Sequence, residues 1–200
     1  LKQIIIDPYQ TKFEEKTFKD MRSLHHLQFY PTISHISHLN PKLFPKLKEI
    51  TIPDSVVSIG ATAFQEIKTI EKVTIPNSVV SIEYDAFKEC TSLKEVKIPK
   101  SVKYIAGGVF CMCTSLEKIE IPNSVVFIGA GTFGHCSSLK EVTLPNSIGS
   151  LENDLFFKCE KLEKIIFKNP DANANQTNNE KNIIPNSITT INQSTFEECS

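Results

Sequence analysis

The sequence predicts a solenoid, mainly β or α/β in class, built from about eight copies of a 23-residue repeat. Two columns of residues carry this prediction. Proline recurs with a period of 23, at Pro53, Pro76, Pro99, Pro122 and Pro145. Phenylalanine recurs in the same register, 11 residues later, at Phe64, Phe87, Phe110, Phe133 and Phe156. Columns of leucine and isoleucine keep this frame, so each repeat is expected to form one coil of a stack.

The first part of each repeat predicts a short strand. In Leu47–Ile52, apolar and polar residues alternate toward the end of the segment, which is typical of a strand with one buried face. Pro53 ends the strand because proline has no backbone N–H to donate. In later repeats an Asn-Ser pair such as Asn77-Ser78 provides turn chemistry. We therefore expect the chain to reverse direction at this point.

The second part predicts another short strand and then a turn. A β-branched run such as Ser78–Ile82 indicates the strand, and the less regular stretch through Phe87 and Cys90 has room for one helical or 3-10 turn. Stacked coils would place like residues above one another at the parallel-strand spacing of about 4.8 Å. Because one repeat cannot bury its apolar face alone, the coils are expected to share one core.

The repeat frame predicts a single domain over residues 1–200. Leu24 and Phe18 keep the columns in the N-terminal part, whereas Pro41 stands where phenylalanine is expected. Neither end carries a polar cap, so we expect the chain to be part of a longer array. The domain is divided into divergent repeats at residues 1–46, regular repeats at 47–167, an Asn-rich insertion at 168–184 and a resumed repeat at 185–200.

The repeat resembles that of the BspA-like leucine-rich-repeat family. The resemblance is clearest over residues 115–147, where the Ile121-Pro122 step, Phe133 and Cys136 occur together. It covers nearly the whole chain and departs only at residues 8–46 and in the insertion. It implies a right-handed, curved solenoid with parallel strands, often used for adhesion or host-protein binding on microbial or protist cells.

Two charged residues follow the leucine column in each regular repeat, and their order inverts from one repeat to the next. Lys48-Glu49 is followed by Glu71-Lys72, so each charge faces its opposite in the neighbouring coil. We interpret these residues as cross-strand pairs that stabilise the stack. A charged binding strip is the alternative, although alternating charges present no net field to a partner. The next outward strand position is the candidate protein-binding strip: Thr51, Thr74, Lys97, Glu120 and Thr143.

Most of the cysteines share one repeat column, namely Cys90, Cys113, Cys136, Cys159 and Cys199. Earlier repeats place Phe44 and Ile67 there, so packed thiols are predicted. Disulfides between coils are disfavoured because parallel side chains keep Cβ atoms about 4.8 Å apart, beyond the usual separation of about 3.5–4.5 Å. Cys111 lies outside the column and is predicted to be the most reactive thiol.

No pattern indicates an enzyme, a cofactor or a metal site. Cys111-Met112-Cys113 lacks zinc-finger spacing, and the histidines, among them His25 and His135, lie in no recognised ligand pattern. The sequence contains no Gly-rich phosphate loop, HExxH or G-x-S-x-G. We therefore predict a non-enzymatic protein without cofactors.

The charge balance argues against nucleic acid as a partner, since 22 Lys+Arg stand against 23 Asp+Glu. Apolar runs are too short to span a membrane, so no membrane insertion is expected. We predict a monomeric module that binds a protein partner, and the resemblance places it on the cell surface or in a secreted form. The alternatives are an intracellular scaffold or regulatory subunit in the cytoplasm, or a structural spacer.

Two sequence features bear on these alternatives. Asn175 and Asn192 match the N-glycosylation pattern, which favours secretion only slightly. The insertion at 168–184 lacks aromatic residues and is expected to be a surface loop, since lengthening a loop costs little entropy. A recognition element is the other interpretation of the insertion.

Overall fold

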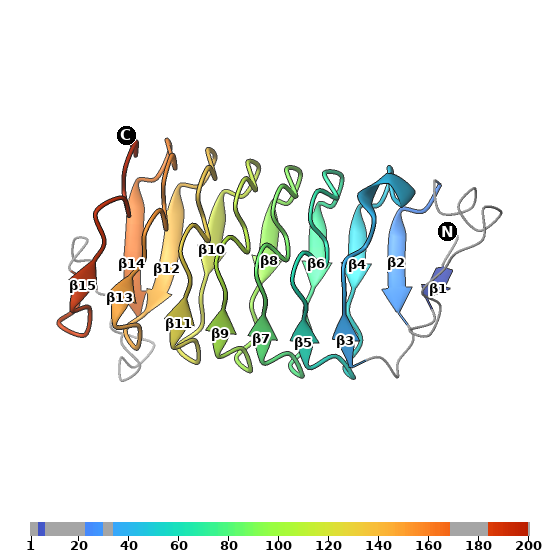
Figure 1. Cartoon of the computed structure of the whole chain (residues 1–200), viewed down its shortest axis with the longest axis horizontal. Coiled ribbons are helices and arrows are strands. Elements are labelled where there is room, and N and C mark those ends of the chain that lie inside the picture. Colours follow the sequence, from blue (N-terminus) through green and yellow to red (C-terminus); the bar gives the residue numbers. More distant parts are fainter. Residues whose placement is uncertain (1–3, 7–22, 30–33, 169–183, 200) are drawn as a thin grey trace, which may run out of the picture.

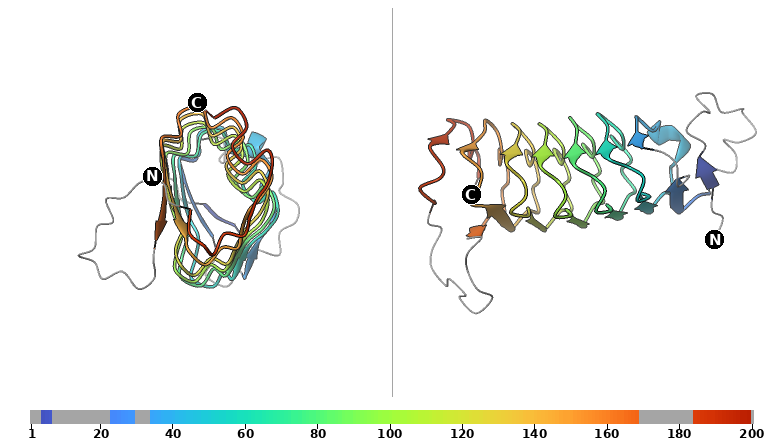
Figure 2. Two further views of the ribbon diagram at one scale, coloured as in Figure 1. Left: turned by 90° about the vertical axis from the view of Figure 1, so that its left-hand side faces the viewer. Right: turned by 90° about the horizontal axis from the view of Figure 1, so that it is seen from below.

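The computed structural model describes residues 4–6, 23–29, 34–168 and 184–199, and within them the chain winds as a solenoid (Figure 1). Parallel strands form two ladders that run along opposite edges of the stack (Figure 2, right). The first ladder comprises β1 (Ile4–Ile6), β2 (His26–Phe29), β4 (Glu49–Thr51), β6 (Lys72–Thr74), β8 (Glu95–Lys97), β10 (Lys118–Glu120), β12 (Glu141–Pro145) and β14 (Lys164–Lys168). The second comprises β3 (His35–Ile36), β5 (Ser58–Ile59), β7 (Ser81–Ile82), β9 (Tyr104–Ile105), β11 (Phe127–Ile128), β13 (Ser150–Leu151) and β15 (Thr190–Ile191), and it consists of two sheets that divide between β11 and β13.

The strand register reproduces the sequence period. Ile50 pairs with Val73, which pairs in turn with Val96, each step being 23 residues. At the C-terminal end, Leu151 of β13 pairs with Ile191 of β15, a step of 40 residues. The predicted solenoid of stacked parallel strands is thus confirmed, and the class is mainly β.

Helical turns are rarer than the sequence suggested. Within the described ranges, the only helix is the 3-10 helix η1 (Pro41–Leu43). In the regular coils the corresponding stretch forms tight turns, because two positions per coil have left-handed backbone conformations that end any helix. In one coil these are Thr62 at φ 56° and Glu66 at φ 60°, and in the next Asp85 at φ 54° and Glu89 at φ 60°.

A stack of phenylalanine rings runs through the core. The rings of Phe87 and Phe110 have centroids 5.6 Å apart and are inclined by 7°, and the neighbouring pairs repeat this geometry with centroid separations of 5.1 to 6.0 Å. Within residues 64–156 these rings are fully buried. Each ring covers the next, so the stack couples adjacent coils and makes the core continuous along the solenoid. The members of this phenylalanine stack are Phe64, Phe87, Phe110, Phe133, Phe156 and Phe196.

The cysteine column packs beside this stack, as predicted. Each thiol donates to the backbone carbonyl of a phenylalanine in the preceding coil, for example Cys113 Sγ to Phe87 O at 3.2 Å. Burial raises the pKa of the Cys159 thiol to about 12, so the thiolate that would react is disfavoured. Cys111 lies outside the column and is half-buried, and burial also raises its pKa. The column therefore serves packing.

Candidate protein-binding face

The predicted strip lies on the outer face of the first ladder. Register aligns Thr51, Thr74 and Lys97 across β4, β6 and β8, and aligns Glu120 with Thr143 across β10 and β12. Thr74, Lys97 and Glu120 are exposed, whereas Thr51 is partly buried. The structure therefore brings the strip into one row, with its exposed members in the middle.

Thr143 is a correction to this strip. It was expected to face solvent, but its exposed fraction is only 7%. An ion pair between Lys168 on β14 and Glu120 on β10 spans β12, the strand between them that carries Thr143. Thr143 therefore contributes little exposed surface to the strip.

The first ladder is divided between β8 and β10. One sheet contains β1, β2, β4, β6 and β8, and a second contains β10, β12 and β14. In the other coils a backbone bond joins the residues just before the strands, as from Glu71 N to Lys48 O at 2.8 Å and from Lys140 N to Glu117 O at 2.9 Å. Within the continuously described residues 94–120, the equivalent bond from Glu117 to Lys94 is absent. We call this interruption between β8 and β10 the seam.

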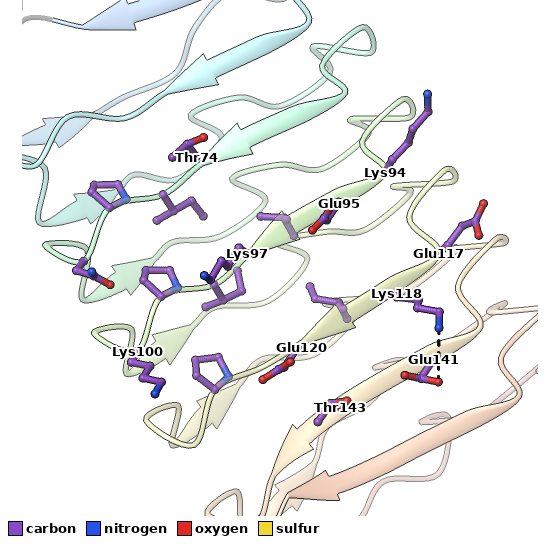
Figure 3. A pocket seen from close by; sticks show the side chains of 18 of the residues that line it. Thr74, Lys94, Glu95, Lys97, Lys100, Glu117, Lys118, Glu120, Glu141 and Thr143 are labelled. Atoms are coloured by element: carbon purple, nitrogen blue, oxygen red, sulfur yellow. Dashed lines mark ion pairs between the residues drawn. The ribbon is translucent and has the colours of Figure 1, made fainter. Parts of the chain in front are cut away.

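The charged columns form ion pairs on both sides of the seam. Lys48 and Lys94 both contact Glu71, at 2.7 and 3.5 Å, which confirms the predicted pairing between coils. The hydrogen bond from Lys48 is the main cause of a lowered pKa for Glu71. Beyond the seam, Lys118 and Glu141 pair at 3.8 Å (Figure 3). These carboxylates and amines pair with one another within the ladder.

No such pair crosses the seam in this described part of the ladder. Lys94 and Glu117 face each other across it without contact within 4 Å, as do Glu95 and Lys118 (Figure 3). The interruption of the backbone ladder thus coincides with an interruption of the charge pairing.

A shallow, open hollow of about 1250 Å³ lies over the seam, on the outer faces of β6, β8, β10 and β12 (Figure 3). Four residues of the predicted strip line it, together with Glu95 and Lys100, which lie outside the strip; the four are Thr74, Lys97, Glu120 and Thr143. Within residues 34–168, Glu95, Lys97 and Lys100 have no ion-pair partner. The hollow therefore presents unpaired charges of both signs.

Lys100 was missed by the sequence analysis, although a signal for it existed. Its turn column reads Asp54, Asn77, Lys100, Asn123 and Asn146, so lysine is the exception in a column of short polar residues. Lys97 and Glu120 are likewise exceptions in their own column, where the other three residues are threonines. A residue type that is absent from the equivalent positions of other coils is not needed for the fold. Lys97 and Lys100 are of this kind.

The described residues hold no arrangement that suggests bound metal or membrane insertion. Among them, no group of three or more His, Cys, Asp or Glu side chains is placed to hold a metal ion. The histidines make local contacts instead: His38 Nδ1 lies 2.9 Å from Thr62 O, and His26 lies 3.5 Å from Glu49. Nor does this part of the chain contain a helix of the length and hydropathy needed to cross a bilayer.

Comparison with known families identifies the repeat. The profile described as "BspA type Leucine rich repeat region" matches in six copies, over residues 1–116, 41–163 and 169–200. The chain belongs to this family. The count is slightly lower than the eight repeats expected from the sequence. Members of a leucine-rich-repeat family have a fold suited to protein–protein interaction, which agrees with the exposed ladder described above.

Solved structures of leucine-rich-repeat proteins share the fold. A leucine-rich-repeat protein of T. pallidum is 28% identical, with a TM-score of 0.68 over 71% of this chain and 69% of that one. A leucine-rich-repeat protein from Bacteroides ovatus is 31% identical, with a TM-score of 0.61 over 71% of this chain and 39% of that one. The pneumococcal vaccine antigen PcpA is 15% identical, with a TM-score of 0.59 over 87% of this chain and 46% of that one. No curated protein matches the sequence significantly.

Proposed function

We propose that this leucine-rich-repeat chain is a monomeric, non-enzymatic module that binds another protein through the hollow over the seam. The observation that carries the proposal is the coincidence of unpaired charges with that hollow. Along most of the ladder, lysines and glutamates pair with each other, whereas Glu95, Lys97 and Lys100 have no ion-pair partner in residues 34–168. Charges without internal partners are available for electrostatic complementarity with another surface.

The shape and charge of the hollow favour a protein partner over other ligands. Small-molecule sites are enclosed and mostly apolar, with volumes of about 300–1,000 Å³, whereas this hollow is open and larger. Nucleic acid requires a basic surface, but here Glu95 and Glu120 lie beside Lys97 and Lys100. A folded protein can offer both signs of charge over such an area.

Reversing two charges in the hollow is expected to weaken partner binding at least tenfold. The change is the double variant Lys97→Glu and Glu95→Lys, which reverses two charges that have no ion-pair partner in residues 34–168 and places like charges opposite those that the partner has matched. Proteins captured from native cells by the wild-type chain would be compared quantitatively with those captured by the variant. Affinities for the recovered protein would then be measured with purified components.

The matched control is Lys46→Glu, a charge reversal on an exposed lysine outside the hollow. The control is expected to bind like the wild type. A partner that binds the wild type, the control and the double variant equally would contradict the proposal, provided that all three chains unfold at similar temperatures.

We propose further that the binding occurs at the cell surface and serves adhesion or binding of host proteins, as the family resemblance suggests. PcpA, which has the same fold, is a pneumococcal vaccine antigen. Protease treatment of intact native cells is expected to release peptides such as residues 104–118. Release only after lysis would contradict a surface location and favour the alternative, an intracellular scaffold, which the free thiol of half-buried Cys111 also fits.

A further inference from the structure

The second ladder carries aromatic side chains at positions where most other coils have small residues. The outward position of its strands is Ser58, Ser81, Ser150 or Thr190 in four coils, and His35 in the first strand of the ladder. In two adjacent coils it is Tyr104, which is 54% exposed, and Phe127, which is 44% exposed. These two residues pair in register on β9 and β11, so they lie side by side. Serine in the equivalent coils indicates that the fold does not require aromatic rings there.

Tyr84 departs from its column in the same way. The equivalent residues of the neighbouring coils are Ala61, Gly107 and Ala130. Tyr84 is 65% exposed, and its ring lies 3.5 Å from the point where a Cβ of Gly107 would stand. The ring thus leans over the coil that carries Tyr104.

Exposed valines extend this surface. Backbone hydrogen bonds stack Val80, Lys103 and Val126 in consecutive coils, from Lys103 N to Val80 O at 2.8 Å and from Val126 N to Lys103 O at 3.0 Å. Both valines are exposed. In the described ranges, large exposed hydrophobic residues occur only on this side of the solenoid and in the last coil, and the first ladder has none. We call the set Val80, Tyr84, Tyr104, Val126 and Phe127 the aromatic patch.

The charged side chains around the aromatic patch differ in whether they have an ion-pair partner. Lys103 lies between its two valines, is exposed, and has no ion-pair partner in the described residues. Of the nearby acidic residues, Asp85 pairs with Lys88 at 3.5 Å, whereas Glu83 keeps its negative charge because it only accepts a hydrogen bond from the Ser81 hydroxyl at 2.8 Å. The surface therefore offers apolar rings beside Lys103, a cation without an ion-pair partner in the described residues.

We propose that the aromatic patch is a second docking surface, and that its occupant is a protein segment carrying apolar side chains beside a carboxylate. Contiguous exposed apolar surface marks interaction sites, and tyrosine and phenylalanine are enriched at the centres of protein interfaces. The unpaired Lys103 selects for a negative group next to the apolar anchors. Because the two ladders run along opposite edges of the solenoid (Figure 2, right), this surface and the hollow can be occupied at the same time.

The test is selection of peptides from a displayed random library, with the wild-type chain as bait and the double variant Tyr104→Ser and Phe127→Ser as counter-bait. The variant installs the residue that other coils carry, so it is expected to fold with an unchanged unfolding temperature. Peptides enriched by the wild type are expected to combine apolar side chains with Asp or Glu. Their affinity is expected to fall at least tenfold for the double variant and for Lys103→Glu.

Lys97→Glu, in the hollow, serves as the control and is expected to leave peptide affinity unchanged, so the two surfaces are tested separately. The proposal is overturned if the wild type and the double variant enrich the same peptides, or if Lys103→Glu binds the selected peptides as well as the wild type does. It is also overturned if the patch instead mediates self-association, seen as a dimer in sedimentation that the double variant abolishes. Binding to a glycan array that depends on Tyr104, without any selected peptide, would likewise overturn it.

Discussion

Replacing Phe110 with alanine is expected to lower the free energy of unfolding by about 3–5 kcal/mol. Phe110 is fully buried in the middle of the phenylalanine stack, where its ring stacks on Phe87 at 5.6 Å and on Phe133 at 6.0 Å. Truncation removes the apolar contacts of one ring and exposes cavity surface on both neighbours. Since coupling between coils carries the stability of a solenoid, the loss is expected to affect the whole array. Denaturant unfolding followed by circular dichroism would measure it.

Phe127→Ala is the matched control for this experiment. The same side chain is removed from the adjacent coil, but Phe127 is 44% exposed and lies outside the stack. Its loss is expected to cost less than about 1 kcal/mol, as for surface substitutions in general. Equal destabilisation by the two substitutions would refute a core that depends on the stacked rings.

The substitution Gly129→Ala is expected to destabilise the protein by about 1–3 kcal/mol, in the range of overpacked sites. A Cβ at this position would lie 2.4 Å from Gly107 N and 2.7 Å from Ala106 C. Both contacts are to the backbone of the preceding coil, so no side chain can rotate away and the two coils must separate. The unfolding temperature is expected to fall accordingly.

Gly149→Ala provides the comparison, because a Cβ there meets nothing within 4 Å. Neither glycine has a left-handed φ, so the two substitutions differ mainly in the space available. Gly149→Ala is expected to leave stability unchanged or raise it by a few tenths of a kcal/mol, since alanine reduces the entropy of the unfolded chain. A Gly129→Ala variant as stable as Gly149→Ala would show that the coils can shift apart freely.

The parts of the candidate site that sequence could predict are those that repeat. The position of Lys97 on the outer face followed from strand alternation, and the pairing of Lys48 with Glu71 followed from the inversion of charge order between coils. Each of these depends only on a residue's own coil and on the next one. The exposed aromatic residues also left a signal, since Tyr104 and Phe127 stand between coils that carry serine at the same position, Ser81 and Ser150. That signal is visible only when columns are compared for their exceptions.

The sequence by itself determined the length of the coil, the two strands in each coil, and the columns that form the core, because every coil must bury the same apolar positions against its neighbours. Only the tertiary structure decided where the first ladder divides and that Thr143 is buried. The division lies between β8 and β10, and the burial of Thr143 accompanies an ion pair in which Lys168 reaches Glu120 across an intervening strand. Contacts of this kind depend on the separation of neighbouring coils and on the reach of single side chains, which a 23-residue pattern does not encode.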